Sequence, residues 1–410
     1  MPVTQIRAGM DRRYPGSWIC SPGIRIIASR AQSYAILLYY HLIVTDDCNL
    51  CCSYCRAKAF DDPVNECSTA VEIDEDLPVD LACDISDLNA FLARDTDPVL
   101  TFYGGEPLLR PDIIRRIMDD APVRRFMIQT NGLLLDRLGQ DYINRFATIL
   151  VSLDGRAGLT DAHRGPGTYR RVMDNVQGIL SGGYAGELIV RMTVAEDTDI
   201  VDAVTYLADN PDHAFGSIHW QLDANFTADF SSRNFTAWAE ESYNPGIRTL
   251  VSRWVSLMET TGTVPRWYPF LDTMDDLLHG RQSLLRCGAG HTNFAIMTDG
   301  HIAPCPVMIG MKRFYSGHIR TSRPEDLVRT PVGGDCPACR IRGFCGGRCL
   351  YASIVAPWNA DQRRLVCGTV ENLHAALLAA VPKVRSLIRG GVITPADFAH
   401  EKYNGCEIIP

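Results

Sequence analysis

Six short apolar runs, separated by longer amphipathic stretches, occupy the region between residues 37 and 222. The runs are the predicted strands Leu37–Val44, Val99–Tyr103, Arg125–Gln129, Thr148–Leu153, Leu188–Val194 and Ile218–Leu222. Intervening stretches such as Asp112–Asp120 and Tyr169–Leu180 have the apolar spacing of helices. Strands that alternate with helices predict a parallel sheet with crossover helices. Because six units are too few for a closed eight-unit barrel, we expect an α/β fold, a partial (β/α)6 TIM-like barrel with its chemistry at the C-terminal strand ends.

Cysteine is the second informative residue type. The chain has 15 cysteines among 410 residues, gathered near its two ends. No charged segment followed by a long apolar core precedes them, so we expect a cytoplasmic protein whose thiols serve metal ligation or redox chemistry. The longest apolar stretch, Ala35–Val44, contains His41 and is too short to span a bilayer, so no membrane is expected. The formal net charge of -8 argues against a nucleic-acid partner.

Three cysteines follow the first predicted strand with the spacing C-x3-C-x2-C. They are Cys48, Cys52 and Cys55. Three thiolates in one loop can hold three irons of a [4Fe–4S] cluster and leave the fourth iron open to a non-protein ligand. Two alternatives are a buried helical face of small thiols and a zinc site.

This loop, with an aromatic residue at Tyr54, resembles that of the radical S-adenosylmethionine (SAM) superfamily. The resemblance implies that the three cysteines bind the cluster, that SAM chelates the open iron, and that Tyr54 lies near the adenine. Gly104-Gly105-Glu106, after the second strand, resembles the family's GGEP motif, whose backbone and carboxylate receive the SAM ammonium group. Two glycines do permit close backbone approach. The other SAM contacts that the resemblance implies are Ser152, Asp154, Arg191 and Gln221. Each of these four, taken singly, has a structural role as an open alternative.

The C-terminal cysteines resemble the SPASM extension of these enzymes, a small Cys-rich domain with two auxiliary iron–sulfur clusters. By position, the distal cluster would be bound by Cys336, Cys339, Cys345 and Cys367, and the nearer one by Cys287, Cys305 and Cys349. Asn293 stands where other members have a further cysteine, so we expect an open site, a non-cysteine ligand such as His291, or a smaller nuclearity. A zinc ribbon on the distal set is the alternative. Asp299-Gly300 between apolar runs predicts a hairpin.

The predicted organisation has five parts. These are an N-terminal extension (1–36), a radical SAM core (37–225), a helical connector (226–285), the SPASM domain (286–370) and a C-terminal helix and tail (371–410). The acidic stretch 61–87 is either a solvated insertion or a docking face for a basic peptide.

The resemblance implies an enzyme that cleaves SAM to a 5′-deoxyadenosyl radical and modifies a peptide. The chain looks most similar to a group of archaeal proteins thought to modify peptides. The outcome would be a thioether or carbon–carbon crosslink, or epimerisation, on a precursor peptide or protein, with a flavodoxin- or ferredoxin-like electron donor. The alternatives are anaerobic sulfatase maturation, with Asp223 as a candidate base, and a multi-cluster electron carrier. Cys406 is a candidate hydrogen-atom donor, whereas Cys20, Cys51, Cys67 and Cys83 have no assigned role.

Overall fold

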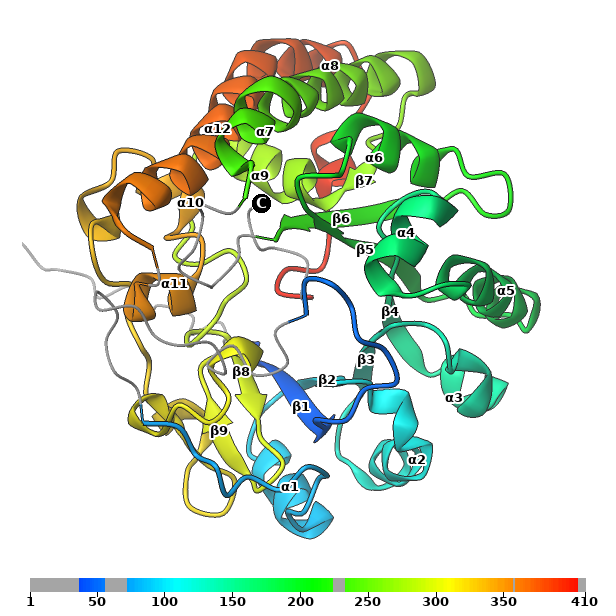
Figure 1. The fold of residues 1–410 in the computed structure, drawn as a ribbon, viewed down its shortest axis with the longest axis vertical. Coiled ribbons are helices and arrows are strands. Elements are labelled where there is room, and N and C mark those ends of the chain that lie inside the picture. The colour runs from blue at the N-terminus through cyan, green and yellow to red at the C-terminus, as the bar shows by residue number, and fades with distance from the viewer. Residues whose placement is uncertain (1–36, 56–71, 224–232, 357, 405–410) are drawn as a thin grey trace, which may run out of the picture. The chain divides into compact units, whose positions relative to one another are not determined.

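The computed structural model describes residues 37–55, 72–223, 233–356 and 358–404 (Figure 1). All of them belong to one compact unit, Ile36–Pro410, which is distinct from Met1–Ala35. The prediction for Cys406, and those for Cys20 and Cys67, therefore lie outside the described residues.

The described residues form one ten-stranded sheet in the order β10-β9-β8-β1-β2-β3-β4-β5-β6-β7. The strands of the predicted core are β1 (Tyr39–Thr45), β2 (Val99–Gly104), β3 (Arg125–Thr130), β4 (Phe146–Ser152), β5 (Glu187–Val194) and β6 (Ser217–Leu222). They pair in parallel and in chain order, and the short β7 (Arg266–Trp267) adds to β6. The predicted partial barrel of parallel strands is confirmed.

The edge of the sheet beside β1 is occupied by a segment from the C-terminal part of the chain. β8 (Asn293–Ile296) pairs in parallel with β1, which places His41 opposite Ala295. β9 (His301–Ala303) and β10 (Gly317–His318) continue the sheet with antiparallel pairing. The predicted hairpin joins β8 to β9, with Gly300 at a φ of 95°. The Cys-rich region thus begins inside the same sheet as the core.

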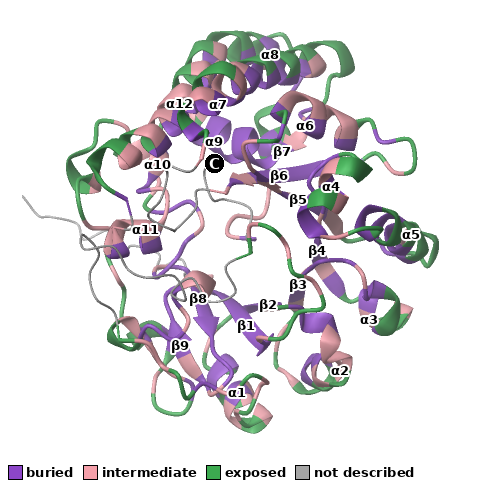
Figure 2. Ribbon diagram, in the orientation of Figure 1, coloured by how far each residue is buried: buried purple, intermediate pink, exposed green. Residues whose placement is uncertain are grey.

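Helices lie outside the strands and complete the crossovers (Figure 1). In chain order they are α1 (Ile85–Leu92), α2 (Pro111–Asp120), α3 (Gln140–Ile143), α4 (Ala157–Arg164), α5 (Thr168–Ser181), α6 (Ile200–Ala208), α7 (Phe235–Trp238), α8 (Asn244–Thr261), α9 (Tyr268–His279), α10 (Arg342–Cys345), α11 (Leu350–Val355) and α12 (Ala360–Arg389). Figure 2 shows buried strands and helices whose outer faces are exposed. The region predicted as a helical connector holds α7, α8 and α9.

Alternation along the strands gives the sheet two different faces. On β1, the side chains of Tyr40, Leu42 and Val44 pack in the apolar layer under the helices. The opposite face of the same strands carries a small cluster inside the barrel, made of Tyr39, Val99, Met127, Leu150, Ile189 and Tyr268. We call this cluster the barrel floor. It closes the interior below the C-terminal strand ends, where the functional residues lie.

Helix α12 is the one helix among the described residues with the length and hydropathy to cross a membrane. It nevertheless packs along α8 and α9, and its residues Leu373, Leu377 and Val384 are buried in the large apolar core. Asn359 begins it with a capping box, because its side chain accepts from the backbone of Gln362. This helix, which includes the predicted helical run 370–388, also carries Cys367.

Candidate active site

The first cysteine loop leaves the C-terminal end of β1 and is fixed by backbone contacts. The Ser53 amide donates to the His163 carbonyl over 2.8 Å, which ties the loop to α4. Cys48 and Cys55 are exposed, and Cys52 is half-buried. Burial raises the pKa of Cys52 to about 11, with the neighbouring thiols of Cys55 and Cys48 adding to the rise and Arg164 opposing it. The three predicted cluster ligands therefore lie within electrostatic reach of one another.

The glycines of the second motif pack directly against this loop. A Cβ atom on Gly104 would lie 2.1 Å from the Thr45 carbonyl oxygen, and one on Gly105 would lie 2.3 Å from the Asp47 carbonyl oxygen. The Gly105 amide donates to Thr45 over 2.8 Å, so the two backbones are hydrogen-bonded as well as in contact. Only glycine fits at these positions, because any side chain would meet backbone that cannot move aside cheaply. The motif thus sets the position of the cysteine loop.

Glu106 differs from its expected role. Its carboxylate is fully buried and accepts hydrogen bonds from the Thr130 hydroxyl (2.8 Å), the Leu108 amide (3.0 Å) and the Asn131 amide (2.7 Å). Burial raises the pKa of Glu106 to about 7, against the lowering effect of these donors. The carboxylate joins the ends of β2 and β3 and does not face open space. The expected contact between this carboxylate and the SAM ammonium group is therefore not supported by the geometry.

Asp154 also has protein partners for its whole carboxylate. The Arg164 guanidinium donates to it through Nε (2.8 Å) and Nη2 (3.0 Å), the Tyr54 hydroxyl donates over 2.8 Å, and the Thr193 amide donates over 2.9 Å. Burial alone would raise the pKa of Asp154, but Arg164 and the hydrogen bond from His163 hold it at about 2. These contacts are accounted for by a structural role of Asp154, because its carboxylate holds Tyr54, a residue of the cysteine loop.

Arg164 was not assigned a role by its sequence context, although its segment follows the fourth strand. Its guanidinium is buried and lies 5.4 Å from the centre of the Tyr54 ring. Its positive charge lowers the pKa of Cys52, which favours the thiolate that a metal requires. A buried arginine at the end of an amphipathic helix is not distinguishable, by spacing alone, from a surface arginine.

A polar layer covers the barrel floor. Moving two residues along each strand from the floor leads to Gln129 on β3 and Arg191 on β5, with Ser152 in register beside Arg191. The Arg191 guanidinium donates to the side-chain oxygens of Gln129 and of Gln221, the latter over 2.8 Å. Within the described residues, no carboxylate forms an ion pair with Arg191. Its charge is therefore held in place by two neutral amides and remains available to an anion, which fits the expected role toward a carboxylate.

Asp223 lies at the end of β6, and its carboxylate is 3.4 Å from the Arg233 guanidinium. Arg233 also pairs with Glu196 at 2.6 Å. A carboxylate stabilised by a guanidinium is a weaker base, so this ion pair favours a structural role for Asp223. Its candidacy as a catalytic base stays a prediction.

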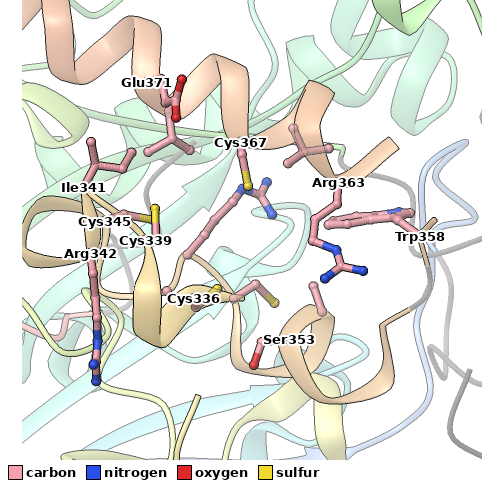
Figure 3. A pocket seen from close by; sticks show the side chains of 16 residues that line it. Cys336, Cys339, Ile341, Arg342, Cys345, Ser353, Trp358, Arg363, Cys367 and Glu371 are labelled. Atoms are coloured by element: carbon pink, nitrogen blue, oxygen red, sulfur yellow. The ribbon is translucent and has the colours of Figure 1, made fainter. Parts of the chain in front are cut away.

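Four of the C-terminal cysteines, those predicted as ligands of the distal cluster, line one cavity, and their role as cluster ligands stays a prediction. Figure 3 shows Cys336, Cys339, Cys345 and Cys367 around one cavity of about 80 Å³. Burial raises the pKa of Cys367 to about 11, and the thiols of Cys345, Cys336 and Cys339 add to the rise. Arg348 and Arg363 line the same cavity and bring positive charge to it. Four thiols and nearby guanidinium groups suit an anionic iron–sulfur cluster.

The three cysteines predicted for the nearer cluster lie in a small apolar cluster, and one of them, Cys349, also lines the cavity of the other four. Cys287, Cys305 and Cys349 pack there among Leu285, Met308 and Leu350. Burial raises the pKa of Cys305, and the thiols of Cys349 and Cys287 add to the effect. Asn293 is not turned toward a cluster, because its side-chain oxygen lies 2.8 Å from Nδ1 of His41. Burial and the charge of Arg329 lower the pKa of His291, and a ligand role for His291 stays a prediction.

Single-ion sites are not formed by these cysteines. In the described part of the chain, no three His, Cys, Asp or Glu side chains converge on one point as a single metal ion requires. Zinc would draw its thiolates to about 2.3 Å from one centre, whereas a cluster binds each thiolate to a different iron. The donor sets therefore fit iron–sulfur clusters better than the zinc alternatives. Cys51 is exposed, as Cys48 and Cys55 are, and Cys83 contacts the apolar layer under the helices; both stay without an assigned role.

The fold and this site define an α/β enzyme built for radical chemistry at a cysteine loop. Residues 42–203 match the family described as the Radical SAM superfamily, and this part of the chain is a radical SAM domain. An uncharacterized protein of Archaeoglobus fulgidus is 26% identical over 75% of this chain and 74% of its own length. An AdoMet-dependent heme synthase of Oleidesulfovibrio alaskensis is 25% identical over 74% of this chain and 80% of its own length.

A solved structure supports the fold across the C-terminal region as well. The protein titled Native anSMEcpe with bound AdoMet superposes with a TM-score of 0.63 and 15% identity. The superposition covers 86% of this chain and 99% of that one. The chain thus contains a radical SAM domain at residues 42–203, and its barrel and C-terminal part share the fold of that structure.

Proposed function

We propose that this enzyme modifies a peptide or protein side chain by hydrogen abstraction, using a SAM-binding cluster and two auxiliary clusters. One observation carries the proposal. Ten cysteines that are distant in sequence lie in the loop after β1, around one C-terminal cavity and in an adjoining apolar cluster. This placement supports a cluster at the loop and two more in the C-terminal region. A protein that only carries electrons would need neither the GGEP-like turn nor the polar layer above the barrel floor.

A SAM-bound [4Fe–4S] cluster at the first loop would supply a 5′-deoxyadenosyl radical. Cys48, Cys52 and Cys55 would hold that cluster, and the glycines at 104 and 105 keep the loop against β2. Arg191 would hold a carboxylate of SAM, because two amides fix its guanidinium and leave its charge available. The apolar barrel floor excludes water from below, which protects a reactive radical from side reactions.

A peptide is the preferred substrate class. The superposed protein is also known with bound AdoMet and a Cp18Cys peptide, at a TM-score of 0.63 over 86% of this chain. We infer that the interior of this barrel receives a peptide side chain, delivered in an anaerobic cytoplasm with a flavodoxin- or ferredoxin-like electron donor. The bond formed would be a thioether or a carbon–carbon crosslink, or the outcome would be epimerisation.

The cluster assignment is tested first, by iron content after anaerobic reconstitution. Three [4Fe–4S] clusters would give about 12 irons per chain. Cys52→Ala should lower the count by about four irons and abolish 5′-deoxyadenosine formation from SAM. Cys51→Ala, at the adjacent exposed position, is the matched control and should retain both. Equal losses in the two variants would contradict the assignment.

The reaction class is tested by mass spectrometry. The enzyme, SAM and dithionite are incubated with peptides encoded by short reading frames next to the gene. Loss of two hydrogens from a peptide indicates a crosslink or thioether. A mass that is unchanged in H2O but is raised by one deuterium in D2O indicates epimerisation. If 5′-deoxyadenosine forms but no peptide changes, peptide modification is wrong.

A second candidate is chemistry on a tetrapyrrole, because one relative that matches most of this chain is named AdoMet-dependent heme synthase. Oxidative decarboxylation of such a substrate would release carbon dioxide and change its absorption spectrum. Adding an iron tetrapyrrole carboxylate to the same incubation separates this outcome from peptide modification. The sulfatase-maturating alternative stays open, and the ion pair between Asp223 and Arg233 bears only on Asp223 as its candidate base.

A further inference from the structure

His41 lies on β1 with its ring inside the barrel, one step above the floor. Tyr39, two residues earlier on the same face, belongs to the floor, and Tyr40 on the opposite face packs under the helices. The imidazole is 5% exposed and meets the Tyr103 ring edge-to-face at 5.3 Å. The charge of Arg191 acts on His41, so the two side chains belong to the same polar layer. This layer lies directly below the cysteine loop that ends β1.

Asn293 fixes which nitrogen of His41 carries a proton. The Asn293 amide nitrogen faces two backbone carbonyls, that of Cys287 at 3.2 Å and that of Tyr403 at 3.5 Å. Carbonyls only accept, so the amide nitrogen must point toward them and the amide oxygen must face His41 Nδ1, 2.8 Å away. An oxygen that only accepts requires a proton on Nδ1. In the neutral ring, Nε2 is then an unprotonated acceptor.

The surroundings keep the imidazole neutral. Burial lowers the pKa of His41 to about 4, the charge of Arg191 lowers it further, and the hydrogen bond with Asn293 opposes both. Among the described residues, the polar or charged groups near the ring are Thr101, in register with His41 on β2, and Tyr103, Asn293 and Arg191. No described residue donates a hydrogen bond to Nε2. The barrel therefore holds a lone pair of fixed direction that has no donor among the described residues, beside a guanidinium that has no carboxylate partner among them.

We propose that His41 is a substrate-binding residue whose Nε2 accepts a hydrogen bond from the O–H, S–H or N–H group of the reacting peptide side chain. The inference rests on the proposed peptide-modifying function and names the chemistry of the group it receives. Because Nε2 has no donor among the described residues, a donor on the substrate would give this acceptor a hydrogen-bond partner. In the same polar layer Arg191 would bind the carboxylate of SAM, and His41 would bind the substrate.

The test compares two replacements of one residue. His41→Asn keeps an amide N–H where Nδ1–H donates to Asn293 but removes the acceptor at Nε2. His41→Gln extends its amide to the Nε2 position, where its oxygen can accept. The probes are a fluorescently labelled copy of the peptide that wild-type enzyme modifies, and a second copy whose modified residue lacks the O–H, S–H or N–H donor. Binding is measured on cluster-loaded, unreduced enzyme with SAM present, and iron content identifies variants that fail to load.

A neutral hydrogen bond of this kind corresponds to about a tenfold change in affinity. We expect wild type to bind the donor-lacking peptide about tenfold more weakly than the parent, and His41→Asn to bind the two peptides equally. His41→Gln should restore most of the discrimination. Discrimination that persists in His41→Asn, or is missing in wild type, overturns the inference while the proposed function stands. If His41→Asn fails to load iron, the inference is judged from the affinities of wild type and His41→Gln for the parent and the donor-lacking peptide. If wild type modifies no peptide, the proposed function fails, and this inference fails with it.

Discussion

The ion pair of Asp154 with Arg164 can be compared with a second pair of the same geometry at the surface. Arg156 contacts Asp202 through Nε and Nη2, both at 2.8 Å, so both pairs are bidentate. Side-chain exposures are 7% and 0% for Arg164 and Asp154, against 57% and 46% for Arg156 and Asp202. Solvent screens the surface pair, whereas the buried pair has no water to replace a lost partner. Removal of one carboxylate should therefore have very different costs at the two sites.

Asp154→Asn leaves the Arg164 cation buried without its counter-charge, at a cost of about 3–5 kcal/mol. Asp202→Asn should cost at most about 1 kcal/mol. At roughly 2 °C per kcal/mol for a large chain, the apparent Tm should fall by about 6–10 °C in the first variant and by about 2 °C or less in the second. Differential scanning fluorimetry of cluster-loaded protein, at one scan rate under anaerobic conditions, measures both.

Equal changes in Tm at the two sites would refute the reasoning from burial. A second variant separates the lost charge from the lost shape. Arg164→Met in the Asp154→Asn background removes the uncompensated cation, so it should recover part of the lost stability. Failure of this double variant to improve on Asp154→Asn would show that the hydrogen bonds to Tyr54 and Thr193, and not the ion pair, dominate at this position.

Three further predictions concern the same region. Gly105→Ala should displace the cysteine loop and cost about four irons per chain, whereas Gly178→Ala in α5, where a Cβ atom meets nothing within 4 Å, should retain them; iron analysis checks both. Glu106 has a pKa raised by burial from 4.5 to about 7, so its contribution to stability is complete below pH 4.5 and is lost as the pH rises to about 7. Over that pH range the wild-type protein should lose at most about 3 kcal/mol of its free energy of unfolding, and Glu106→Gln should lose less. Guanidinium unfolding at each pH measures both losses. Arg191→Gln should weaken SAM binding by about tenfold or more, measured by equilibrium dialysis, and an unchanged Kd would remove Arg191 from the cofactor site.

The strands and the cysteine sets could be predicted because their signals are local. The six apolar runs became β1 to β6, and the four cysteines that the resemblance assigned to the distal cluster line one cavity. The roles of Glu106 and Asp154 were less accessible, because a carboxylate in a motif has the same letter whether it faces a ligand or backbone amides. The contact of His41 with Asn293 spans 252 residues and depends on β8 lying beside β1. β8 has only four residues, and its partner β1 lies far from it in the sequence. A run this short has no hydrophobic periodicity from which its partner strand could be predicted.

The pairing of β8 with β1 also governs the order in which this protein can be completed during synthesis. β1 emerges from the ribosome early, yet one of its two edges stays unpaired until the chain has been made past residue 296. At about 5–20 residues per second, this interval lasts roughly 10–50 seconds, in which an exposed parallel edge can pair wrongly. The loop carrying Cys48 continues directly from β1, so its cysteines are expected to reach their final position only after β8 has arrived. A chain truncated before Asn293 should consequently lose stability at the SAM site itself, and insertion of the first cluster is expected to follow, not precede, synthesis of the C-terminal region.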